Sequence, residues 1–147
     1  MARNDAVYEA DFHAWTVEQA RLLRSGDLAA IDVENIAEEL EGMGRSERRE
    51  LRSRLVTLLM HLLKWRGQPG FRSRSWSATI REQRQEIATL LSESPSLAPL
   101  LPAMLSQAYA IAREKAAAET GLAEAEFPAD CPFALDDVLA PGYFPEA

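Results

Sequence analysis

Cysteine is almost absent from this sequence, since Cys131 is the only one among 147 residues. A lone cysteine forms no internal disulfide, so nothing in the chain requires an oxidising compartment. No stretch approaches the roughly 20 apolar residues of a membrane helix, and the first twelve residues lack the apolar run of a signal peptide. The sequence therefore predicts a cytoplasmic protein without a membrane segment.

Patterns typical of β-strands are missing as well. No segment alternates apolar and polar residues, and no repeat or low-complexity run occurs. Hydrophobic residues make up 47% of the chain and charged residues 27%, which is typical of a globular protein with its own core. We expect one all-α domain over residues 1–147: an antiparallel bundle of four to five main helices in residues 1–121 and a proline-spaced tail, residues 122–147, docked on it.

The chain does contain one long apolar stripe, between Glu47 and Trp65. Its leucines recur at steps of four and three residues, which places them on one face of a helix: Leu51, Leu55, Leu58 and Leu62. Further apolar residues widen this face, most densely in its last three turns. We expect this segment to be the central, buried helix of the bundle.

Shorter helices are expected before residue 27. The spacing of aromatic residues predicts a short helix near residues 5–15, followed by a break near residues 15–16. Thr16 fits the capping box that begins a second helix, and Gly26 fits the left-handed position that ends it.

A third helix is expected just before the central one, with Asp32 as its N-cap. Its inner face would hold a run of apolar residues at helical spacing: Val33, Ile36, Ala37, Leu40 and Met43. Gly42 and Gly44 predict the end of this helix, and Ser46 is the expected N-cap of the central helix. These two helices would then be antiparallel neighbours.

After Trp65, two glycines and a proline predict a loop over residues 66–74. A helix is expected to resume at about Ser75, and another to run from about Pro99 to Gly121, with a short turn near residues 95–98 between them. The tail then spaces apolar anchors between prolines and acids. We expect it to dock rather than to stay free, because exposed aromatic clusters favour association.

Basic residues are concentrated in the middle of the chain, although the net charge is −7. Residues 45–84 hold eleven of the sixteen basic residues and three acids, whereas the tail holds six acids and no basic residue. The overall charge argues against general affinity for nucleic acid, and the segregation indicates internal charge pairing. We expect the acidic tail to pair with the basic middle.

Several ordered motifs resemble those of one family. They are Tyr8-Glu9, Asp11-Phe12, Trp15, Asp32, Asn35, Glu38-Glu39, the run from His61 to Trp65, Ser75-Trp76, the run from Ser94 to Leu97, and Phe127-Pro128. In this order they resemble the bacterial domain-of-unknown-function family numbered 29. The resemblance implies a small, all-helical bacterial protein, and it carries no activity, cofactor or catalytic residue with it.

Two residues suggest a catalytic alternative. Arg54 and His61 are seven residues apart and share a helix face, a spacing similar to the short signature of some helical ribonucleases. There the histidine would act as acid or base and the arginine would stabilise phosphate charge. The spacing has low specificity, and Leu55 stands where that group commonly has a polar residue.

Polar residues of the third helix suggest an interhelical network with the central helix. Its expected members are Asp32, Asn35, Glu38, Glu39 and His61, with Glu38 or Glu39 pairing to Arg54, His61 or Lys64. The same atom types suit a metal, but neither histidine has a glutamate three residues before it, as carboxylate-bridged helical sites need. The sequence therefore predicts no metal and no cofactor.

The basic loop and its flanks offer a binding surface: Lys64, Trp65, Arg66, Arg72, Arg74, Trp76 and Arg81. Arginines beside tryptophans hold phosphates and stack bases, but they also hold an acidic tail. The favoured function is a non-catalytic interaction or regulatory module that binds a protein partner or itself. An RNA-directed hydrolase using Arg54 and His61 is the alternative.

Overall fold

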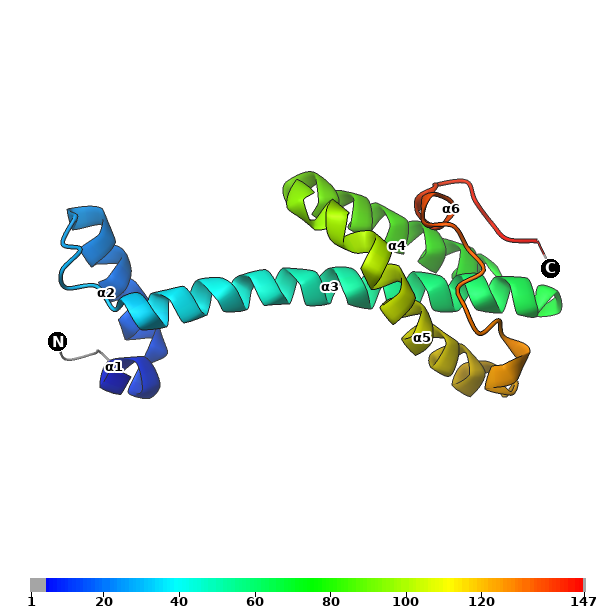
Figure 1. Cartoon of the computed structure of the whole chain (residues 1–147), viewed down its shortest axis with the longest axis horizontal. Helices are drawn as coiled ribbons and strands as arrows, with labels where there is room; N and C mark the ends of the chain where they lie inside the picture. The colour runs from blue at the N-terminus through cyan, green and yellow to red at the C-terminus, as the bar shows by residue number, and fades with distance from the viewer. Residues whose placement is uncertain (1–4, 147) are drawn as a thin grey trace. The chain divides into compact units, whose positions relative to one another are not determined.

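The computed structural model describes residues 5–146, with side chains from Val7 onward (Figure 1). Residues 1–4, which entered the sequence analysis as part of the segment tested for a signal peptide, lie outside this range, as does Ala147. The α-helices are α1 Asp5–Ala10, α2 Phe12–Ser25, α3 Val33–Gly67, α4 Arg74–Glu93, α5 Leu101–Thr120 and α6 Leu135–Leu139. Short 3-10 helices span Pro69–Phe71, Pro95–Leu100 and Glu124–Glu126. No strand occurs among residues 5–146, which confirms the all-α class.

The chain divides into two compact units, Met1–Glu47 and Arg48–Ala147. We call them the first and the second unit. The boundary lies inside α3, whereas the sequence placed its only internal boundary at residue 121. The expectation of a single domain stays a prediction.

Helix α2 of the first unit begins at Phe12, whereas the sequence predicted a start at Thr16. The Asp11 side chain accepts a hydrogen bond from the Ala14 backbone N–H at 3.0 Å, so Asp11 is the N-cap. Thr16 lies inside α2, where its hydroxyl donates to the His13 carbonyl at 2.7 Å, so the break near residues 15–16 was wrong. Gly26 ends α2 with a φ of 74°, as predicted.

Helix α3 is a single helix of 35 residues, which corrects the prediction of two antiparallel helices. Gly42, Gly44 and Ser46 all lie inside it. A glycine within a helix costs only about 1 kcal/mol, and the apolar spacing continues in phase across both glycines. The penalty is therefore too small to stop a helix whose apolar face stays in register.

The second unit holds the large apolar core. Leu51, Leu55, Leu58 and Leu62 are all fully buried, as the stripe predicted. Helices α4 and α5 contribute most of the remaining core: Ile80, Ile87, Leu90, Leu101, Met104, Ala108, Tyr109, Ala112 and Ala116. Ser73 caps α4 by accepting from the Trp76 N–H at 3.1 Å, and Gly121 ends α5 with a φ of 75°.

The tail packs on this core through apolar side chains, with Phe127, Phe133 and Val138 buried. The Trp65 and Phe144 rings lie 4.8 Å apart between centroids. Arginines hold the tail by its backbone carbonyls: Arg84 Nε donates to Val138 at 2.8 Å, and Arg113 donates twice to Phe127 at 3.2 and 3.1 Å.

The tail acids do not pair with the basic middle. Among residues 5–146 the one ion pair that a tail carboxylate forms joins Glu124 to Arg113, at 3.3 Å, and Arg113 lies outside the basic segment. Asp130, Asp136 and Asp137 are exposed. Exposed ion pairs contribute little to stability in water. The tail is therefore held on the second unit by hydrogen bonds from arginines to its carbonyls and by the burial of its apolar side chains. The predicted charge pairing is therefore corrected.

Candidate functional site

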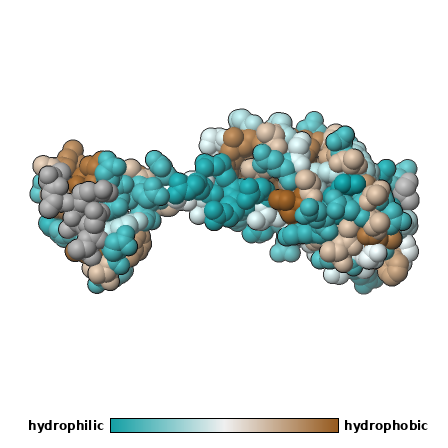
Figure 2. Space-filling model, turned by 60° about the horizontal axis from the view of Figure 1, so that its bottom comes forward, coloured by the Kyte–Doolittle hydropathy of each residue, from teal (hydrophilic) through white to brown (hydrophobic). Residues whose placement is uncertain are grey.

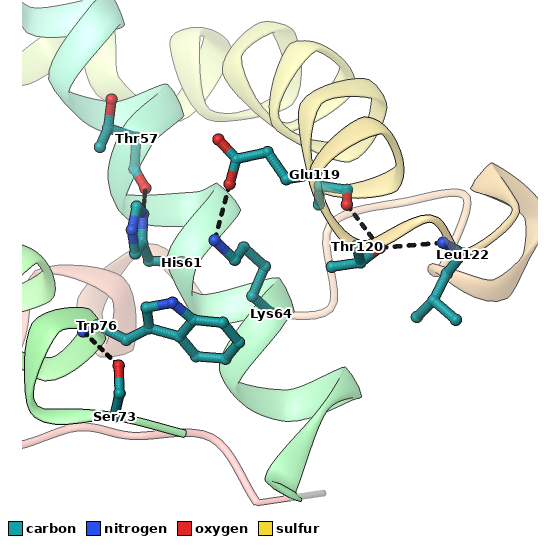
Figure 3. A network of polar contacts seen from close by, with 9 residues as sticks. Thr57, His61, Lys64, Ser73, Trp76, Glu119, Thr120 and Leu122 are labelled. Atoms are coloured by element: carbon teal, nitrogen blue, oxygen red, sulfur yellow. Dashed lines mark hydrogen bonds and ion pairs between the residues drawn. The ribbon is translucent and has the colours of Figure 1, made fainter. Parts of the chain in front are cut away.

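Polar residues of α3, α4 and α5 meet around Lys64 in the second unit (Figure 3). Lys64 is only 8% exposed, and its ammonium donates to Glu119 Oε2 at 2.7 Å. The same nitrogen lies 4.6 Å from the centroid of the Trp76 ring. This hydrogen bond holds the pKa of the Glu119 carboxyl below its usual range. The buried charge of Lys64 is thus paired within the chain.

His61 lies one turn from Lys64 and is half-buried. Its Nδ1 lies 2.9 Å from the Thr57 carbonyl oxygen, so Nδ1 carries the proton and donates it. Burial lowers the pKa of the imidazole, and the nearby Lys64 charge lowers it further. The ring is therefore favoured neutral, with a lone pair on Nε2, which is the form that a general base needs.

Arg54 is engaged by acidic and amide side chains. Its guanidinium lies 3.2 Å from Glu50 and 3.6 Å from Glu86, and it donates to Gln83 at 3.4 Å. A phosphate at this position would compete with two carboxylates for the same donors. The ribonuclease role of Arg54 and His61 stays a prediction.

The basic loop is partly folded back on its own helix. Arg72 Nε donates to the Trp65 carbonyl at 2.8 Å, and its guanidinium carbon lies 5.1 Å from the Trp65 ring centroid. Arg66 is half-buried, whereas Arg74 and Arg81 are exposed. Of the seven predicted binding residues, five have contacts within the chain: Lys64, Trp65, Arg72, Trp76 and Arg81. The predicted binding role of all seven stays a prediction.

The predicted interhelical network presumed two antiparallel helices, whereas α3 is one continuous helix. Asp32 instead binds residues of the first unit: Trp15 Nε1 donates to it at 2.9 Å and Asn35 Nδ2 at 2.8 Å. The Asp32 N–H donates to the Gln19 side chain at 2.7 Å. This network is buried and joins α2 to the start of α3.

The two glutamates of the predicted network have other partners in the first unit. Glu39 accepts a hydrogen bond from the Tyr8 hydroxyl, which raises the pKa of Tyr8 to about 12. Glu38 pairs with Arg45 at 3.2 Å. Within the described part of the chain, no three His, Cys, Asp or Glu side chains gather as metal ligands would.

Four of the five residues predicted for an inner face in this part of α3 are exposed instead: Val33, Ala37, Leu40 and Met43. Val33 is 56% exposed, Leu40 63% and Met43 66%. The side of α3 that packs in the first unit carries Asn35 and Ile36, with Asp32 just before the helix. At 100° per residue, Val33 and Leu40 lie about a quarter turn from this side, whereas Met43 lies nearly in line with Ile36, about two turns further along. We call Val33, Ala37, Leu40 and Met43 the α3 apolar face. The sequence found its members correctly but assigned them to the core.

Exposed apolar side chains occur on both units (Figure 2), and most of the large ones belong to the first unit. Within the part of the chain that the structure describes, eleven large apolar residues are exposed, and eight of them lie in the first unit: Val7, Phe12, Val17, Leu23, Leu28, Val33, Leu40 and Met43. A hollow of about 630 Å³ adjoins the α3 apolar face, beside Met43 and the two glycines, Gly42 and Gly44.

The whole net charge also belongs to the first unit. Residues 1–47 hold eleven acids and four basic residues, a net −7, while residues 48–147 hold twelve of each. Glu34 and Glu41 flank one side of the α3 apolar face and are exposed. The face thus combines apolar side chains with an acidic rim.

Comparisons with known proteins give a family but no activity. The family model described as "Domain of unknown function DUF29" matches residues 7–144. No curated protein and no solved structure matches the chain. Among residues 5–146, none of the helices has the length and apolar character that crossing a membrane requires.

Proposed function

This chain belongs to the DUF29 family, a domain of unknown function, and we propose that it is a non-catalytic protein-binding module. In this proposal the α3 apolar face of the first unit docks an amphipathic helix of another protein. The observation that carries it is the exposure of Val33, Leu40 and Met43 on one helix face. Large apolar residues gathered on an exposed face are typical of interaction sites. We retain the cytoplasm as the predicted location.

Charge complementarity indicates a basic partner. The first unit has a net charge of −7, and Glu34 and Glu41 border the apolar face. A helix with leucines on one side and lysines or arginines along its flanks would meet both features, the helix-in-groove mode of recognition. Two copies of the first unit would instead bring like charges together, so self-association through this face is disfavoured.

A designed peptide pair tests this proposal directly. One fluorescent peptide of about 20 residues, long enough to form a helix, carries a leucine stripe with lysine flanks, and its twin carries glutamate flanks. Fluorescence anisotropy with the full chain should show saturable binding of the basic peptide and at least tenfold weaker binding of the acidic one. Added salt should weaken the basic complex.

Substitutions locate the binding face. The double variant Leu40→Gln and Met43→Gln should weaken peptide binding at least tenfold, because each buried apolar side chain contributes about 1.5–3 kcal/mol. The matched control, Leu100→Gln and Ile111→Gln, removes two exposed apolar residues of the second unit and should bind as wild type. Equal affinity for both peptides, or a dimer in sedimentation velocity that the double variant dissociates, would contradict the proposal.

A further inference from the structure

The second unit buries an arginine whose charge is balanced by no carboxylate among the residues that the structure describes. Arg84 on α4 is 5% exposed. Its Nε donates to the Val138 carbonyl at 2.8 Å and its Nη1 to the Pro141 carbonyl at 3.4 Å. Its Nη2 is buried without a hydrogen-bond partner. Within residues 5–146, no ion pair to this guanidinium is formed.

Burial alone dominates the electrostatics of this side chain. Desolvation lowers the pKa of Arg84, and the interaction with the Tyr143 hydroxyl opposes this shift only in part. Buried charges in proteins are ordinarily paired, and an unused donor nitrogen adds a further cost. The site is therefore short of one anion.

A second arginine adds another positive charge next to Arg84. Arg81 lies three residues before Arg84, so the two side chains are neighbours on α4. Their guanidinium carbons lie 5.9 and 5.7 Å from the centroid of the same Phe144 ring. Two like charges held at one ring repel each other unless an anion lies between or beside them.

Both arginines line the same pocket. It measures about 260 Å³ and is bordered by Arg81, Arg84, Gln85, Ala88, Leu139 and Pro141. One part of this lining thus carries two guanidiniums and an amide, and the rest is apolar. A pocket of this size admits a small molecule of a few heavy atoms and excludes a polymer chain segment of any bulk.

We infer that this pocket between α4 and the tail binds a small aliphatic carboxylate. The carboxylate would accept hydrogen bonds from the exposed Arg81, a pairing for which guanidinium geometry is well suited, and its charge would balance the adjacent Arg84 guanidinium. Its short hydrocarbon part would lie against Ala88, Leu139 and Pro141. Inorganic phosphate offers no apolar part for this wall, so it should bind more weakly.

The pocket belongs to the second unit and the α3 apolar face to the first, and the inference does not depend on the proposed protein partner. Because Arg84 also holds the tail, its ligand would tie α4 to residues 138–141. Arg84 is therefore a poor first target for substitution, since its loss would loosen the tail whether or not a ligand binds. Arg81 is exposed and serves instead.

Butyrate is a suitable probe, with butyramide as its uncharged analogue. We expect butyrate, added to the full chain at constant ionic strength, to produce saturable ¹H–¹⁵N shifts confined to residues 81–88 and 138–144. Butyramide should produce none, and phosphate should bind several-fold more weakly than butyrate.

Two variants and a control complete the experiment. Arg81→Gln should raise the dissociation constant of butyrate at least fivefold, and Ala88→Leu, which fills the pocket without removing charge, should abolish saturation. Arg74→Gln removes an exposed arginine from the same helix outside the pocket and should bind butyrate as wild type. Non-saturable shifts, equal response to butyramide, tighter binding of phosphate, or unchanged binding by Arg81→Gln would each overturn the inference.

Discussion

Two leucines of α3 have the same apolar spacing and opposite surroundings. Leu40 in the first unit is 63% exposed, whereas Leu58 in the second unit is fully buried. Their separation of eighteen residues is five whole helical turns, so the pattern assigns both to one face. The difference between them arises from what covers each half of the helix.

Different elements pack on α3 in the two units, and they pack on different sides of it. In the second unit, α4, α5 and the tail bring their own apolar side chains onto the stripe. In the first unit, α1 and α2 contact another side of α3, where the buried Asp32 and Asn35 bind Trp15 and each other. An apolar stripe thus predicts that a helix face is suited to burial. It does not indicate whether the same chain or another protein covers that face.

Substituting matched leucines gives the largest expected contrast between the two halves. Leu62→Ala should lower the free energy of unfolding by about 2–5 kcal/mol, because it leaves a cavity in a closed core. Leu40→Ala should change it by less than about 0.5 kcal/mol, since the side chain is already in water. Urea unfolding followed by far-UV circular dichroism measures both. Equal losses would mean that Leu40 is buried in the isolated chain.

The polar network should dominate the stability of the first unit. Asp32→Ala removes an N-cap and leaves the buried Trp15 N–H without its acceptor, so we expect a loss of about 1–3 kcal/mol. Hydrogen exchange of the α2 amides reports this loss locally. Asp27→Ala, at an exposed acid in the same unit, is the control. Faster exchange in α4 instead of α2 would contradict this account.

Acid should destabilise the second unit through His61. Burial lowers the pKa of this imidazole in the folded chain below its unfolded value, about 6.5. The unfolded state therefore binds the proton more readily, so the stability held above pH 6.5 is lost as the pH falls. The drop in urea midpoint between pH 7.5 and pH 5.5 should be smaller in His61→Gln than in wild type. His13→Gln, which removes the other, exposed histidine, is the matched control.

The sequence predicted the elements whose signals are local. The buried leucines from Leu51 to Leu62, the ends at Gly26 and Gly121, and the N-cap at Asp32 follow from periodicity and from single-residue geometry. The continuity of α3 was missed because Gly42 and Gly44 outweighed the in-phase stripe in the prediction. A helix tolerates two glycines when its remaining turns are stabilised.

The contacts of the candidate sites could not be predicted in the same way. No sequence pattern indicated that Arg84 binds the tail backbone, because its acceptors are the carbonyls of Val138 and Pro141. The position of a carbonyl depends on how the tail folds, and no side-chain pattern records it. The exposure of Val33 and Leu40 likewise depends on the side of α3 that α2 covers.

The smallest expected effect concerns the tail of the second unit. It distinguishes the contribution of exposed charges to tail attachment from the contribution of buried apolar side chains. Asp136→Asn and Asp137→Asn together remove two exposed carboxylates of α6 that form no ion pair within residues 5–146. The free energy of unfolding should change by less than about 0.5 kcal/mol, and its dependence on sodium chloride should stay as in wild type, because exposed charges contribute little. Val138→Ala is the matched change in the same helix, and it should cost about 1–3 kcal/mol since that side chain is fully buried. If the two asparagine substitutions released the tail to proteolysis while Val138→Ala did not, electrostatic pairing rather than apolar packing would hold the tail in place.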